Sequence, residues 1–157
     1  MHIDIGQIFE KIVGQPCTRK EVGSMRSISL GFGEEAPKRE SRNRDYRLWE
    51  MGTYVGDWKV ISGGCIALSK NRTTNIGELD ALLQTIALGR FVAIRQLSRT
   101  DIRIEMDNGS ALDISGNSRE DDEYFHVFCP DGRYVEFSNA GWRIGSSEGP
   151  WPNERTG

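Results

Sequence analysis

His126 is the first residue to consider for chemistry, because a serine or cysteine nucleophile needs a nearby base. The chain contains two histidines, and the other is His2 beside the initial Met1. Cys129 follows His126 by three residues, and an odd spacing in a strand puts two side chains on opposite faces. This spacing argues against a Cys-His dyad within one strand. We therefore predict that His126 is a core or half-buried histidine.

The sequence has no phosphate-binding P-loop and no dinucleotide-binding fingerprint, and its nearest glycine cluster, Gly31-Phe32-Gly33, is typical of a strand end. We predict a non-enzymatic protein without catalytic residues. A small enzyme with a pocket around His126 and nearby carboxylates remains an alternative.

The cysteines do not suggest a metal site or a disulfide framework. Cys17, Cys65 and Cys129 are odd in number and far apart, with no CxxC spacing. A structural zinc site needs four clustered ligands, which the sequence does not offer. Three buried free thiols are therefore predicted, and no metal or cofactor is expected.

The acidic residues of the second half are candidates for binding a partner. A dense acidic run lies at 120–123, and the outward positions of a predicted strand at 101–107 add further carboxylates. Complementary charge accelerates association and rejects wrong partners, so these residues could dock a basic protein surface. The alternative is a solvated loop without a partner, and EF-hand spacing for calcium is absent. The predicted partner-binding residues are Asp101, Glu105, Asp107, Glu120, Asp121, Asp122 and Glu123.

A basic cluster in the first half offers a different function. Arginines close to exposed aromatic rings can track phosphates and stack bases, which makes single-stranded nucleic-acid binding the first alternative. Interspersed carboxylates nearly cancel this local charge, and tryptophans are more often core residues than stacking platforms. The basic residues are Lys38, Arg39, Arg42, Arg44 and Arg47, and the aromatic ones are Trp49, Tyr54 and Trp58.

Composition indicates a single compact body rich in turns. The 157 residues are 37% hydrophobic and 27% charged and include 18 glycines. The net charge of −3 is unevenly distributed, because residues 1–75 hold 12 basic and 9 acidic residues whereas 76–157 hold 8 and 14. No apolar run approaches the ~20 residues of a membrane helix, and the N-terminus lacks a secretion signal. We expect a cytoplasmic protein that does not bind membranes.

Two segments have the apolar spacing of amphipathic helices. Near the N-terminus, apolar residues recur at helical intervals, at Ile5, Ile8, Phe9, Ile12 and Val13. This spacing predicts a helix from 5 to 13, which Asp4 caps and Gly14 ends. The same spacing from Leu79 to Ala87 predicts a second helix over 78–88, ended by Gly89.

The remaining apolar segments alternate as strands do. A type I′ turn is expected at Asn108-Gly109 and another reversal at Pro130-Asp131-Gly132. The run at 124–129 is apolar on both faces, which predicts a central strand. The charged segment 33–45 is predicted to be a long, mobile loop. Strands are expected within 17–22, 27–32, 46–51, 54–61, 65–68, 91–94, 101–107, 110–114, 124–129, 133–137 and 142–144.

The order of these elements suggests an internal repeat. Ile12-Val13-Gly14 corresponds to Ala87-Leu88-Gly89, and the alternating strand at 28–32 corresponds to the one at 102–106. We predict an α+β fold of two tandem helix-plus-antiparallel-sheet units, 1–75 and 76–146, packed as one domain over 1–157. Residues 147–157 would be a loose tail. Chance similarity between two ordinary α+β halves is the alternative.

The second half resembles a known class of proteins. The stretch Asp101-Ile-Arg-Ile-Glu-Met-Asp-Asn-Gly109, followed by Tyr124 and the Pro130-Asp131-Gly132 turn, is similar to small bacterial immunity proteins of contact-dependent or polymorphic toxin systems. The resemblance implies a cognate toxin as partner and transfers no functional residue. Together with the acidic residues, it leads us to expect a toxin inhibitor that masks a basic toxin surface.

Overall fold

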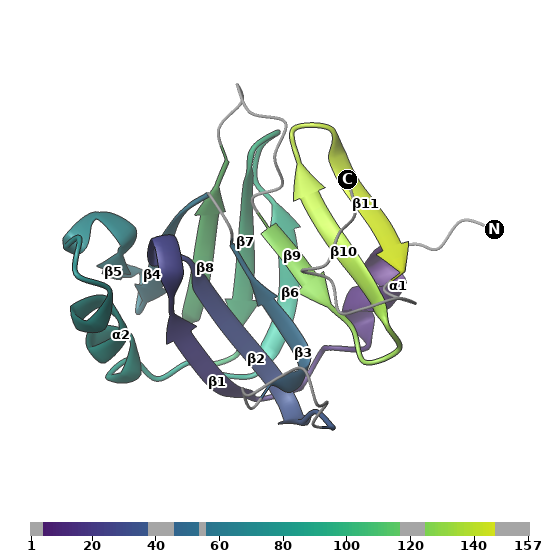
Figure 1. Cartoon of the computed structure of the whole chain (residues 1–157), viewed down its shortest axis with the longest axis horizontal. Helices are drawn as coiled ribbons and strands as arrows, with labels where there is room; N and C mark the ends of the chain where they lie inside the picture. Colours follow the sequence, from purple (N-terminus) through teal and green to yellow (C-terminus); the bar gives the residue numbers. More distant parts are fainter. Residues whose placement is uncertain (1–4, 38–45, 54–55, 117–124, 147–157) are drawn as a thin grey trace.

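A computed structural model describes residues 5–37, 46–53, 56–116 and 125–146 (Figure 1). Within these residues the chain forms two α-helices and eleven strands in two antiparallel sheets. The predicted α+β class is confirmed, with strands as the dominant element. The acidic run at 120–123, the basic residues 38–44 and the predicted tail lie outside the described residues.

The larger sheet has six strands in the order β1-β2-β3-β9-β10-β11, and each neighbouring pair is antiparallel. β9 lies between β3 and β10, which confirms the predicted central strand. The bounds are β1 Cys17–Val22, β2 Ile28–Glu35, β3 Arg47–Gly52, β9 Phe125–Phe128, β10 Arg133–Ser138 and β11 Gly141–Ser146.

The smaller sheet has five strands in the order β5-β4-β8-β7-β6, again antiparallel throughout. Its central strand is β8, which pairs with β4 on one side and β7 on the other. The bounds are β4 Asp57–Ser62, β5 Cys65–Ser69, β6 Phe91–Gln96, β7 Asp101–Met106 and β8 Ser110–Ser115.

The sheets do not follow the two halves of the chain. Strands β1 to β3 form a meander, but β4 and β5 then join β8 in the other sheet. Likewise β6 to β8 form a meander, and β9 to β11 then join β3. The segments 1–75 and 76–146 are therefore not two separate helix-plus-sheet units, and this arrangement does not by itself show a tandem duplication.

The two halves also meet where each meander begins. Pro16 and Arg90 form an isolated antiparallel bridge, the amide of Gly14 donates to the carbonyl of Phe91, and Phe91 donates back to Gln15. These bonds satisfy the backbone just before β1 and at the start of β6, where an unpaired buried amide would be costly.

One hydrophobic core contains the inward residues of both sheets. Alternation creates the inward faces, because every second side chain of a strand points the same way. Ile28, Leu30 and Phe32 of β2 are fully buried, and Phe32 packs edge-on against Phe91 of β6 with ring centroids 5.6 Å apart. Trp58 is buried as well and donates its Nε1–H to the carbonyl of Arg26. The inward strand residues predicted from alternation are confirmed.

The helices lie at opposite ends of the molecule (Figure 1). α1 spans Ile5–Glu10 and α2 spans Ile76–Gln84, so both end earlier than predicted. After Glu10 the amides of Lys11, Ile12 and Val13 bond three residues back, which tightens the last turn into 3-10 geometry. Ile12 is nevertheless fully buried, because the tighter turn still directs it inward.

α2 begins two residues before the predicted start and covers the edge of β1. Asn75 caps the helix by accepting a hydrogen bond from the amide of Glu78. Asp80 then accepts from the amide of Val22, and Gln84 donates to the carbonyl of Lys20. Side chains of α2 thus pair with backbone groups that an open edge strand would expose.

Two loop predictions need correction. β7 ends at Met106 and β8 begins at Ser110, so three residues, 107–109, connect the two strands. Of these three, only Gly109 has a positive φ, of 82°. This is not a type I′ turn, which needs positive φ at two residues. Asn108 instead uses its side chain to accept from the amide of Ser110. The predicted loop at 33–45 also begins later, because β2 continues to Glu35. The turn at Pro130-Asp131-Gly132 is confirmed.

Two short 3-10 helices, η1 (Ser24–Arg26) and η2 (Lys70–Arg72), complete the described elements and are linked by a bond from Arg26 to the carbonyl of Lys70. None of the helices in the described residues is long and apolar enough to cross a membrane.

A matched pair of methionine substitutions tests the assignment of the core. Met51 of β3 is fully buried whereas Met25 of η1 is 71% exposed. We expect Met51→Ala to lower the free energy of unfolding by about 2 to 5 kcal/mol, because it leaves a cavity. Met25→Ala should change it by less than about 0.5 kcal/mol. Urea unfolding measures both, and equal losses would contradict the inward placement of Met51.

Candidate partner-binding surface

The structure places three of the seven predicted partner-binding residues. Asp101 and Glu105 lie in β7 among its outward positions, between the buried Ile102, Ile104 and Met106. Asp107 is exposed in the turn after β7, and its Oδ1 accepts a bond from the amide of Arg90. Glu120, Asp121, Asp122 and Glu123 lie outside the described residues, so the predicted acidic surface is only partly described.

Arginines on the same face of the five-stranded sheet compensate some of these acids. Arg103 of β7 faces Asp113 of β8 and donates two hydrogen bonds to its carboxylate, at 2.6 and 2.7 Å. This bonding raises the pKa of Arg103. Arg95 of β6 forms an ion pair with Glu105, which lies diagonally across from it on β7. Glu105 is therefore neutralised within the chain, which the sequence did not reveal because its partner is on another strand.

A shallow pocket of about 190 Å³ brings Asp101 together with two further carboxylates. The register aligns Asp57 of β4, Ser115 of β8 and Asp101 in one row, so the two carboxylates flank a serine. Asp113 lines the pocket as well, and Leu97 contributes an apolar wall that is 52% exposed. Lys59 is the one basic side chain among the lining residues.

The Lys70 ammonium interacts electrostatically with Asp57, and Asp101 is the other acid of this pocket outside the Arg103–Asp113 pair. No salt bridge among the described residues involves Asp57 or Asp101. Asp57 accepts a bond from the amide of Trp58, and Asp101 accepts one from the hydroxyl of Thr100. A lysine or arginine side chain could lay its alkyl part on Leu97 and its cation between the two carboxylates.

A second polar group lies on the six-stranded sheet around His126. The register aligns Gly52, His126, Glu136 and Arg143, and Arg143 forms an ion pair with Glu136. His126 is 7% exposed and stacks on Phe128, which confirms a buried histidine. The carboxylate of Glu136 therefore lies on the strand position opposite His126, but His126 lines neither of the two pockets described in this structure.

The neighbouring carboxylate of Glu50 is held by arginine. Arg19 donates to Glu50 at 2.8 Å, and the amide of Arg47 donates to it at 2.6 Å. Burial raises the pKa of Glu50, while the positive charge of Arg19 acts in the opposite direction. Gly31 makes room for this arrangement, because a Cβ there would lie 2.5 Å from Glu50 Oε2. The geometry is that of a partly buried, satisfied ion pair.

The basic residues proposed for nucleic-acid contact are only partly described. Arg47 of β3 donates from Nε to the hydroxyl of Thr18 in β1, so its guanidinium reaches across β2 and is held there. Trp49 and Trp58 are 8% and 1% exposed, which leaves neither ring open for stacking on a base. Tyr54 and residues 38–44 lie outside the described part of the chain.

The three cysteines differ in exposure. Cys129 is buried, and its burial raises the thiol pKa to about 12. Burial likewise raises the pKa of Cys17 to about 11. Cys65, in contrast, is exposed in β5 and Cys17 is half-buried, so the prediction of three buried thiols is wrong for Cys65 and holds fully only for Cys129. Among the described residues, no group of three or more His, Cys, Asp or Glu side chains could hold a metal ion.

Known proteins offer no guide to this surface. The chain matches no protein-family model, no curated protein and no solved structure. The function must therefore be argued from the geometry of the described residues.

The cysteines allow a direct test of these environments. At pH 8 a thiol with a pKa of about 11 is ionised in only about one molecule in a thousand, and the thiolate is the reactive form. We expect an aromatic disulfide reagent to modify Cys65 rapidly in the native protein, and Cys17 and Cys129 only after denaturation. Cys65→Ser should abolish the rapid phase. A second rapid thiol in that variant would contradict the burial of the other two.

Proposed function

We propose that this chain is a non-enzymatic binding protein of the bacterial cytoplasm, an immunity protein that neutralises a cognate toxin by masking a basic surface. The proposal joins the resemblance of residues 101–132 to such proteins with the acidic pocket of the five-stranded sheet. It requires no cofactor, metal or membrane contact.

The observation that carries the proposal is the convergence of Asp57 and Asp101 beside the exposed Leu97. A protein interface needs anchors that combine apolar contact with a desolvated charge pair. Here an arginine or lysine of the partner would supply the cation and its alkyl stem. The neighbouring Arg103–Asp113 pair would keep the rim close to neutral, which limits the desolvation cost around the anchor.

We also propose that the two halves are duplicated units that have exchanged their last strands. The order of a helix, a three-stranded meander and a departing pair of strands occurs at 5–69 and again at 76–138. α1 contacts β6 and α2 contacts β1, so each helix packs against the meander of the other unit. The strand β11 is an addition to the second unit.

Removing the two carboxylates tests the pocket in its proposed role. The toxin candidate is the product of the reading frame next to this gene, co-expressed with the full chain. We expect the wild type to bind this product and to protect the host. The double variant Asp57→Asn with Asp101→Asn should bind it about 10- to 100-fold more weakly, because the charge pairs are lost. Calorimetry measures affinity, and growth of the co-expressing host measures protection.

Glu34→Gln with Glu35→Gln is the matched control, because it removes the same charge from exposed positions at the end of β2. It should bind like the wild type. If the neighbouring product neither binds nor harms the host, the immunity proposal fails. If both double variants bind equally, the pocket is not the anchor. Retention on single-stranded DNA that salt abolishes would instead support the nucleic-acid alternative.

A further inference from the structure

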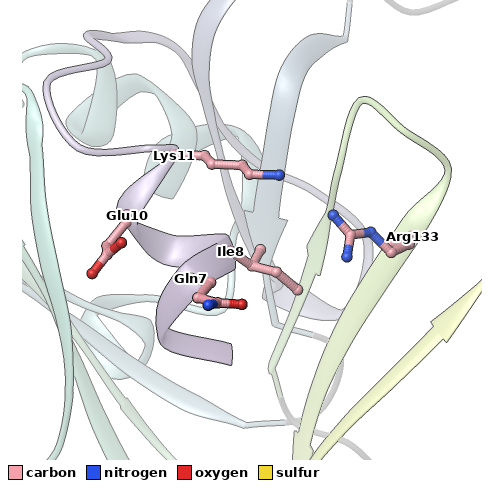
Figure 2. Close-up of a pocket in the computed structure, with 5 residues that line it drawn as sticks. All are labelled: Gln7, Ile8, Glu10, Lys11 and Arg133. Carbon is pink, nitrogen blue, oxygen red and sulfur yellow. The ribbon is translucent and has the colours of Figure 1, made fainter. Parts of the chain in front are cut away.

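A second pocket, of about 340 Å³, lies between the end of α1 and the start of β10 (Figure 2). It is lined by Gln7, Ile8, Glu10, Lys11 and Arg133. Ile8 is 1% exposed, so it belongs to the core and closes the floor of the pocket. Its volume is at the small end of the range for ligand sites, which suits a small molecule or a single side chain.

Two cations converge on this pocket. Figure 2 shows the Lys11 ammonium and the Arg133 guanidinium pointing toward each other from the turn after α1 and from β10, while the Glu10 carboxylate points away from Arg133. Lys11 is exposed, and none of the salt bridges within the described residues involves it. Its ammonium is therefore available to a ligand.

Arg133 is held in place by the turn before β10. Its Nε donates to Asp131 Oδ2 at 2.7 Å, and its amide donates to Asp131 Oδ1 at 3.1 Å. These bonds, together with the charge of Lys11, hold the pKa of Asp131 below its usual range, so its carboxylate is ionised at neutral pH. Asp131 thus orients the guanidinium, and the second carboxylate beside the pocket, Glu10, points away from Arg133.

We propose that this pocket binds a small organic anion, with a carboxylate or phosphate group held by Lys11 and Arg133. A guanidinium offers parallel donors that match both oxyanions, and a lysine adds a point charge. The Gln7 amide lies beside the same space and can donate a further hydrogen bond. This site is on the six-stranded sheet and does not rest on the proposed toxin binding.

Titration of the intact protein with simple probes tests the site. We expect isobutyrate or methyl phosphate to bind saturably with a millimolar Kd and to shift the backbone NMR signals of Ile8, Lys11 and Arg133. Neutral isobutyramide should neither bind nor shift these signals. The ratio of the two affinities distinguishes a carboxylate from a phosphate ligand.

Variants of Lys11 separate a specific site from general charge. Lys11→Gln should weaken binding about tenfold through loss of one charge-assisted hydrogen bond, and Lys11→Arg should retain it. Lys59→Gln removes a lysine from the five-stranded sheet and should leave the affinity unchanged. An unchanged Kd in Lys11→Gln with an unchanged melting temperature would overturn the proposal, as would the absence of saturation with both anionic probes.

Discussion

The exchange of strands between the two sheets is the constraint on which the rest of the structure depends. β4 and β5 complete the sheet that the second half begins, and β9 to β11 complete the sheet of the first half. Backbone amides and carbonyls of buried strands must be paired, so β3 requires β9 and β8 requires β4. Each half therefore depends on the other, and the single hydrophobic core forms only from both.

This exchange also determines where charge appears. The sequence separates an overall basic first half from an acidic second half, and two oppositely charged faces would follow if each half formed its own sheet. The five-stranded sheet instead places Asp57 and Lys59 from the first half beside Asp101 and Arg103 from the second. Opposite charges are thereby mixed, and the potential binding features become local pockets rather than whole faces.

The two pockets are positioned by different means. Register alone aligns Asp57, Ser115 and Asp101, and a shift of one residue would turn all of these side chains toward the core. The basic pocket depends instead on packing, because the buried Ile8 and Ile12 seat α1 and its following turn near the start of β10. A rigid sheet therefore holds the acidic pocket, whereas a short helix and a turn form the basic one.

The sequence by itself determined most of the local structure. Alternation identified the strands and the inward residues Ile102 and Ile104, and helical spacing located both helices, because these patterns reflect contacts within one element. It could not determine that Asp57 would join Asp101, or that Arg95 would neutralise Glu105. It also could not bring Arg133 to Lys11. Each of these neighbours lies on a separate element, and only the tertiary structure, through strand pairing for the first two and helix packing for the third, decides which distant side chains share a surface.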